Sequence, residues 1–155
     1  MPYNNKKRES ATVATPDALK RIDGWIQTDF EDETIAFTDK FAKELVDNRL
    51  TTSQIRIIFS EVKRIASRVS LPEGSLVGNK KDFLMLRPKM AYAAKRAGTH
   101  GTKSLQEVLE RAHIAVTDKM KEDQIKESEV DRIFFNFVDF FESILAYHKV
   151  HGGRD

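Results

Sequence analysis

The 155-residue chain contains no cysteine, which excludes disulfide bonds and thiolate metal ligands. This absence fits a protein of the reducing cytosol, so we expect a cytoplasmic location. No apolar run approaches the roughly 20 residues that a membrane-spanning helix needs. The N-terminal stretch MPYNNKKRESATVATP also lacks the apolar core of a signal peptide. We therefore expect no association with a membrane.

Motifs for catalysis are also missing. The chain has no glycine-rich phosphate loop, no His-Glu-x-x-His and no Gly-x-Ser-x-Gly. His148 and His151 have a spacing that suits two ligands of one metal ion, but no nearby acid completes the set. No carboxylate stands in an apolar setting that would tune its pKa for acid–base chemistry. We expect neither an enzyme, nor a cofactor, nor a metal site.

Charge, by contrast, is concentrated in the middle of the chain. Residues 49–103 contain twelve Lys and Arg residues and only three acids, so this segment carries a net charge of +9. The remaining residues hold 14 bases and 21 acids, for −7, and the whole chain has +2. A basic segment of this kind predicts either a face that meets a polyanion or a solvated face that balances acids elsewhere.

Hydrophobic periodicity is helical almost throughout, and no strand alternation competes with it. We expect an all-α, single-domain bundle of five to six helices over residues 16–152, after a flexible polar tail of residues 1–15. Three helix starts have local signals: Thr15 before Pro16, the capping acids 31–33, and a capping box from Thr51 to Gln54. A short helix through Ile22 and Trp25 is predicted after Pro16, and a second helix, with apolar positions from Ile35 to Val46, after the acids. Further helices are predicted from the capping box to Val69 and over residues 80–97, 102–121 and 128–150, with Pro88 either kinking or restarting the helix over 80–97.

Two basic stretches are candidates for binding nucleic acid. The first runs from Asn48 to Arg56, where arginines and hydroxyls at a helix N-terminus predict an anion site with free backbone N–H groups. An ordinary helix cap with two solvated arginines is the alternative. On the same helix, Arg56 and Lys63 fall on one flank of the apolar stripe, whereas Arg64 and Arg68 fall on the other flank or the back.

The second basic stretch combines Arg87-Pro88-Lys89 with Tyr92, Lys95 and Arg96. Lys89, Tyr92 and Arg96 share one helix face, away from the apolar stripe. An aromatic ring among cations can contact the RNA backbone or stack on a base. A solvated face with a half-buried tyrosine remains the alternative.

Three segments together resemble the small α-helical subunit of type III-A CRISPR effector (Csm) complexes. They are Leu50-Thr51-Thr52-Ser53-Gln54-Ile55-Arg56 with Glu61-Val62-Lys63, then Leu86 to Arg96, and finally Phe137 to Lys149. The resemblance covers about residues 35–150, with the three segments in the family's order and spacing. It implies a non-catalytic subunit of an antiviral defence complex. Phe135, off the centre of the last apolar stripe, is a candidate contact to a neighbouring subunit.

The resemblance also implies partners and contact residues. The expected partners are the guide CRISPR RNA, its complementary target RNA, the backbone and large subunits of the Csm complex, and further copies of the chain itself. Sequence specificity in such complexes comes from base pairing, so the subunit needs backbone contacts. Carried over by position, the RNA contacts are Arg49, Thr52, Arg56, Lys63, Arg87, Lys89 and Arg96. The alternatives are a stand-alone, sequence-independent helical nucleic-acid-binding protein and a helical adaptor with no nucleic-acid role.

Overall fold

The computed structural model describes residues 12–155, and this part of the chain is helical without a strand. This confirms the predicted all-α, single-domain fold. Residues 1–11 of the predicted tail lie outside the described part. The helices are α2 (Pro16–Gln27), α3 (Asp32–Asp47), α4 (Thr52–Val69), the short 3-10 helix η1 (Val77–Asn79), α5 (Lys80–Ala97), α6 (His100–Met120) and α7 (Glu127–Val150).

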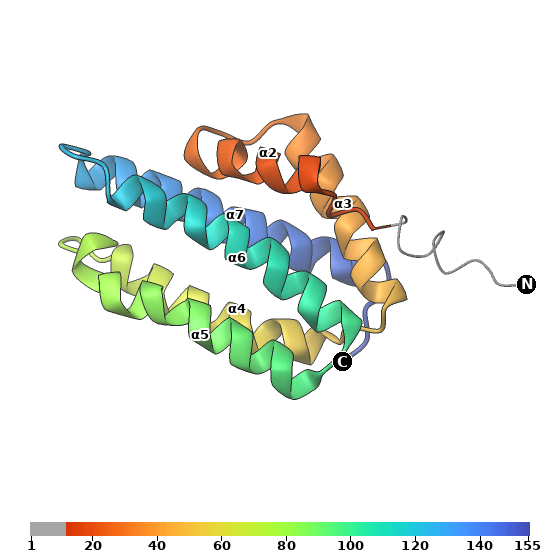
Figure 1. Ribbon diagram of the computed structural model, residues 1–155. Helices are drawn as coiled ribbons and strands as arrows, with labels where there is room; N and C mark the ends of the chain where they lie inside the picture. The colour runs from red at the N-terminus through yellow and green to blue at the C-terminus, as the bar shows by residue number, and fades with distance from the viewer. Residues whose placement is uncertain (1–11) are drawn as a thin grey trace, which may run out of the picture.

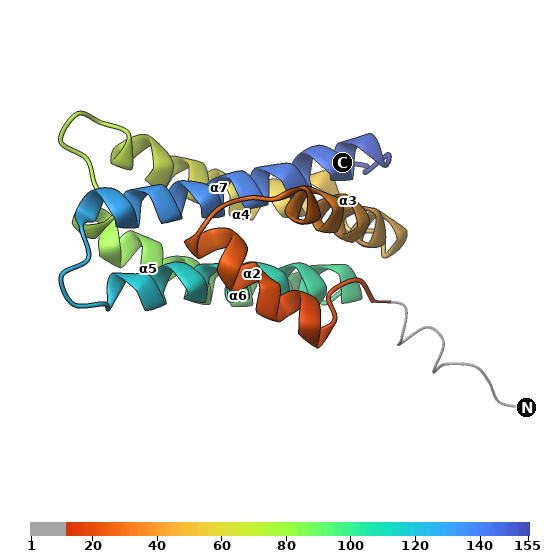
Figure 2. The same cartoon turned by 90° about the horizontal axis from the view of Figure 1, so that it is seen from above.

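The four longest helices, α4 to α7, run side by side (Figure 1). Helix α4 packs against α5 and α7, and α6 packs against the same two helices, so the four form a bundle. Helix α2 covers α6 and α7, while α3 lies mainly on α7 (Figure 2). The hairpin of α4 and α5 therefore forms one side of the molecule, and it carries most of the basic segment 49–103.

Helix α7 supplies much of the core, because it contacts α2, α3, α4 and α6. Phe134, Phe137, Phe140 and Phe141 are fully buried. The ring of Phe140 packs on α2 and α3, with its centroid 6.5 Å from that of Trp25 and 6.2 Å from that of Phe37. A stripe this wide needs neighbours on more than one side, and the short helices α2 and α3 provide them.

The three helix starts predicted from local signals agree with the structure, whereas α6 begins at His100 and not at the predicted residue 102. Thr51 caps α4, accepting the N–H of Gln54, whose side chain in turn accepts the N–H of Thr51. Glu31 is the N-cap residue of α3, and Asp32 and Glu33 lie in its first turn, where their charge favours the helix dipole. The acidic run is thus confirmed as a capping element.

Proline 88 lies inside one continuous helix, α5, so it does not restart the chain. A proline in a helix interior lacks the N–H that would bond the carbonyl four residues earlier. Because Pro88 is exposed, that carbonyl, on Leu84, is left on the solvent side of the helix. The buried residues Phe83, Leu86, Met90 and Ala94 keep α5 on the core across this position.

The N-terminal part of the described chain lies against α3. The backbone N–H of Val13 donates to the Glu44 carboxylate over 2.7 Å, and Thr12 contacts the same group. None of the helices within residues 12–155 is long and apolar enough to cross a bilayer.

Candidate nucleic-acid interface

The outward face of α4 presents two exposed cations, Arg56 and Lys63. They lie seven residues apart, which is about two helical turns, so they point the same way. The exposed serines 53, 60 and 67 lie between and beside them. Neither cation forms an ion pair with any residue of the described chain, and the Lys63 ammonium lies 5.8 Å from the centre of the Phe59 ring. This pair, here called the α4 outer face, is free to meet an anion.

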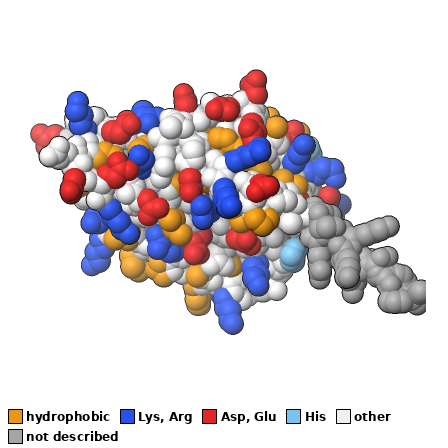
Figure 3. All heavy atoms as spheres, turned by 45° about the horizontal axis from the view of Figure 1, so that its top comes forward, with side chains coloured by type: hydrophobic (Ala, Val, Ile, Leu, Met, Phe, Trp, Pro, Cys, Tyr) orange, Lys and Arg blue, Asp and Glu red, His pale blue; other side chains and the backbone are white. Residues whose placement is uncertain are grey.

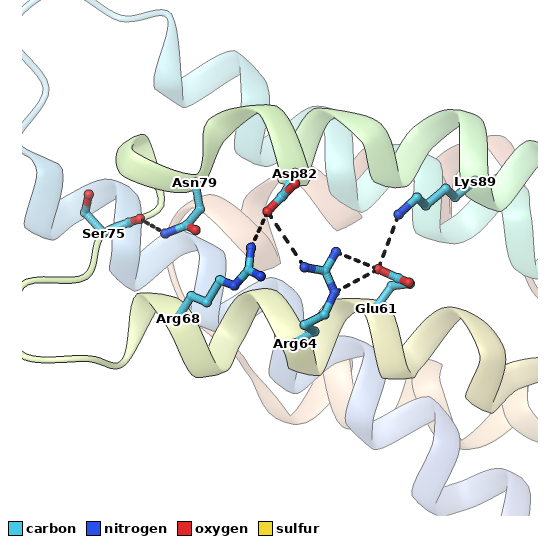
Figure 4. Close-up of polar contacts among 7 residues, drawn as sticks. All are labelled: Glu61, Arg64, Arg68, Ser75, Asn79, Asp82 and Lys89. Carbon is cyan, nitrogen blue, oxygen red and sulfur yellow. Dashed lines mark hydrogen bonds and ion pairs between the residues drawn. The ribbon is translucent and has the colours of Figure 1, made fainter.

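The arginines on the other flank of α4 are instead paired with acids (Figure 4). Arg64 contacts Glu61 over 2.8 Å and Asp82 over 3.8 Å, and Arg68 contacts Asp82 over 2.8 Å. From α5, Lys89 reaches Glu61 over 3.4 Å. The hydrogen bond from Arg64, with help from Lys89, lowers the pKa of Glu61. These five residues, the α4–α5 ladder, join the two helices and partly neutralise their own cations.

Beside the ladder, α4 and α5 enclose an open groove with a volume of about 750 Å³. Lys89, Tyr92 and Arg96 all line this α4–α5 groove, as the shared helix face predicts. Ile57 lines it from α4, and its side chain and that of Tyr92 are 65% and 67% exposed. The second basic stretch thus provides an aromatic ring and two cations at one surface groove.

Arg87 points away from this groove, toward α6. Its Nη2 lies 3.3 Å from Nδ1 of His113 and 3.4 Å from the Thr117 hydroxyl. Its Nε is buried without a hydrogen-bond partner in the described chain. The helix turns by about 100° per residue, which separates Arg87 from Lys89 although they are neighbours in sequence.

His113 is a buried group that the sequence patterns did not single out. Its ring stacks on that of Phe83 with centroids 4.1 Å apart, and its Nε2–H donates to the Phe83 carbonyl over 2.6 Å. Burial lowers its pKa to about 4, and the nearby Arg87 charge acts in the same direction. Its burial could have been predicted from its position in the sequence, because His113 follows Leu109 and Ala112 on the apolar stripe of α6.

The N-terminus of α4 differs from the free anion site that the sequence predicts. The N–H of Thr52 donates to the Arg154 carbonyl over 2.6 Å, and the capping box uses the N–H groups of Thr51 and Gln54. Thr52 itself is fully buried. The prediction of free backbone N–H groups is therefore wrong for these three. The capping box uses two of them, and the C-terminal segment folds back over the helix end to accept the third, from Thr52. Arg49 stays exposed beside it.

The two C-terminal histidines have separate partners. Buried His148 donates from Nε2 to the Leu50 carbonyl over 2.7 Å, and His151 contacts the Asp39 carboxylate. Within residues 12–155, no group of three or more His, Asp or Glu side chains is placed to hold a metal ion.

Elsewhere the surface charge is mixed. On the face shown in Figure 3, basic and acidic side chains are interspersed, and hydrophobic side chains reach the surface along its lower edge. Of the seven predicted contact residues, the structure leaves five exposed: Arg49, Arg56, Lys63, Lys89 and Arg96. Arg87 and Thr52 are turned into the protein.

The fold and the site define a class of protein, a small helical bundle with one basic helical hairpin. A family model described as Csm2 Type III-A matches residues 29–154. The chain belongs to this family, and it is thereby a small subunit of a type III-A CRISPR complex. No curated protein and no solved structure matches it.

Proposed function

We propose that the chain is a non-catalytic subunit that holds the paired guide and target RNA of its complex by their backbones. Several copies would stack along the RNA, each offering its α4–α5 hairpin. The α4 outer face carries this proposal, because Arg56 and Lys63 are exposed, point the same way and form no ion pair in the described chain, although Asp139 and Glu142 line a shallow hollow with Lys63. Two such cations, about 10 Å apart along the helix, can meet separate phosphates.

The chemistry of the surface favours backbone contacts over base reading. Lysine and arginine neutralise phosphates, and serine hydroxyls add hydrogen bonds, without any dependence on sequence. A complex guided by base pairing needs no more than this from the protein. Family membership supports the same role, since the other subunits of such a complex could carry its catalytic steps.

The direct contacts in this proposal are the five exposed cations, Arg49, Arg56, Lys63, Lys89 and Arg96. Thr52 and Arg87 act indirectly. The N–H of Thr52 joins the first turn of α4 to the C-terminal segment, and Arg87 links α5 to α6 through His113 and Thr117.

The test is the double charge reversal Arg56→Glu with Lys63→Glu, in the assembled complex. Each phosphate contact contributes about one unit to the slope of log affinity against log salt. We expect weaker capture of target RNA and a slope smaller by about two for each copy of the chain that contacts the RNA, measured by titrating labelled RNA at several salt concentrations.

The matched control is Lys20→Glu with Lys40→Glu, on α2 and α3. Both lysines are exposed, and the change in net charge is the same. This control should leave the slope unchanged. An equal loss of affinity in both double variants, or an unchanged slope in the first, would refute the proposed contact site.

A further inference from the structure

The α4–α5 groove has the size and lining of a ligand site. Its volume of about 750 Å³ lies within the range of about 300–1,000 Å³ that small-molecule sites occupy. Buried Ile58, Leu86 and Met90 form its floor, and exposed Ile57 and Tyr92 form its walls. Neither Arg56 nor Lys63 lines it, so it is separate from the α4 outer face.

The charges at the groove favour an anionic occupant. Lys89 and Arg96 lie three and four residues from Tyr92, a spacing that puts all three on one face of α5. Arg96 forms no ion pair within the described chain, and Lys89 shares Glu61 with Arg64. The groove lining therefore holds two cations against one acid, Glu61.

Gln54 adds a hydrogen-bond donor at the same place. Its side-chain oxygen accepts the N–H of Thr51, which turns its amide NH₂ group away from the helix end. That NH₂ group makes no hydrogen bond within residues 12–155, and Gln54 lines the groove. A carbonyl or ring nitrogen at the edge of a nucleobase would accept from it.

From these features, we propose that the α4–α5 groove binds one unpaired nucleobase of the RNA. The base stacks on Tyr92, its edge accepts from Gln54, and the adjoining phosphate lies between Lys89 and Arg96. This rests on the proposed function, because the RNA must run along the α4–α5 hairpin. A flat aromatic ring flanked by cations accommodates both the face of a base and its phosphate.

The experiment is an abasic scan of both RNAs in the assembled complex. Single abasic riboses are placed in turn along the guide RNA and along the target RNA, and the affinity for target is measured with the wild-type chain and with Tyr92→Ala. An abasic site also removes a base pair, but that loss is common to both proteins and cancels in the comparison.

We expect a coupling at one or a few positions. There, an abasic ribose costs the wild-type complex about five-fold more affinity than it costs the Tyr92→Ala complex, as for a single stacked base. The strand in which these positions fall identifies whether guide or target supplies the base. Tyr92→Phe keeps the ring and should keep the coupling.

Two controls separate this site from other roles. Met85→Ala changes an exposed side chain of α5 outside the groove and should behave as wild type. Because Tyr92 is 67% exposed, Tyr92→Ala should also unfold at the wild-type temperature. Equal abasic penalties in both proteins at every position of both strands would overturn the proposal.

A second result would also overturn it. If Tyr92→Ala lowered the amount of the chain that copurifies with the complex and left the abasic penalties unchanged, the groove would be a protein interface. The double variant of Arg56 and Lys63 is scored separately, since it should weaken every RNA in the scan equally. If that double variant bound RNA like the wild type, the phosphate contacts would be refuted, but the coupling at Tyr92 would not be affected.

Discussion

At the scale of single residues, buried His113 makes the stability of the bundle depend on pH. It is a neutral imidazole that donates to Phe83 and faces the Nη2 of Arg87, the one charged group near it from α5. Protonation would place a second positive charge beside Arg87 in a buried position. Because protonation is unfavourable in this buried position, the pKa of His113 is lowered to about 4.

We therefore predict that acid destabilises the chain through His113. In the unfolded chain its pKa is near 6.5, so between pH 6.5 and 4 the unfolded state binds more protons than the folded state. The free energy of unfolding should fall by about 3 kcal/mol across this range through this group alone. Denaturant unfolding of the full chain at a series of pH values measures it.

The variant His113→Gln should be less stable at pH 7 and should lose this part of the pH dependence. His100→Gln is the matched control, because His100 is exposed on the same helix. A wild-type profile that is flat between pH 6.5 and 4, or one that His100→Gln flattens instead, would contradict the prediction.

Sequence reasoning located the cations but not all their partners. Helical period alone separates Arg56 and Lys63 from Arg64 and Arg68, and the structure agrees. The period does not reveal that Asp82 lies opposite Arg68, because that depends on the register between α4 and α5. Likewise, nothing local in the sequence shows that Arg154 covers the N–H of Thr52, 102 positions earlier in the chain.

At the scale of elements, α5 is one continuous helix although it contains Pro88. We predict that Pro88→Ala stabilises the full chain by about 1–3 kcal/mol, because alanine restores the N–H that bonds the Leu84 carbonyl and removes the ring clash. The measurement is the free energy of unfolding in urea at constant pH.

The control for this change is Lys95→Ala, at another exposed position of α5 that has no ion pair in the described chain. It should alter stability by no more than about 0.5 kcal/mol. A Pro88→Ala chain that is no more stable than wild type would show that the surroundings of Pro88 already offset the missing hydrogen bond.

The elements themselves were largely predictable, since each has its own local signal. The capping box at Thr51 and the apolar stripe through Ile55 and Val62 fix α4 from sequence alone. The path of α5 was less certain, because a proline permits both a kink and a restart. The structure has one continuous helix across this position, with Phe83 before Pro88 and Met90 after it both fully buried.

At the scale of the whole molecule, the uneven charge along the sequence becomes an uneven distribution of charge over the surface. Most of the segment with net charge +9 forms the α4–α5 side, whereas the rest of the chain is net acidic. The five exposed cations proposed to contact RNA are few for tight binding, since ion pairs with RNA weaken steeply with salt. Under the proposed stacking, several aligned copies would together supply the contacts that one chain lacks.

Our last prediction follows from this alignment. The isolated chain should bind target RNA weakly, whereas the complex, at the same salt concentration, should bind it about 10²–10⁴-fold more tightly, because neighbouring subunits raise the effective concentration of each contact. Titration of one labelled RNA with each preparation measures the ratio. Tight, stoichiometric binding by the isolated chain would instead indicate a protein that binds nucleic acid on its own, since a surface that needs no alignment gains little from assembly.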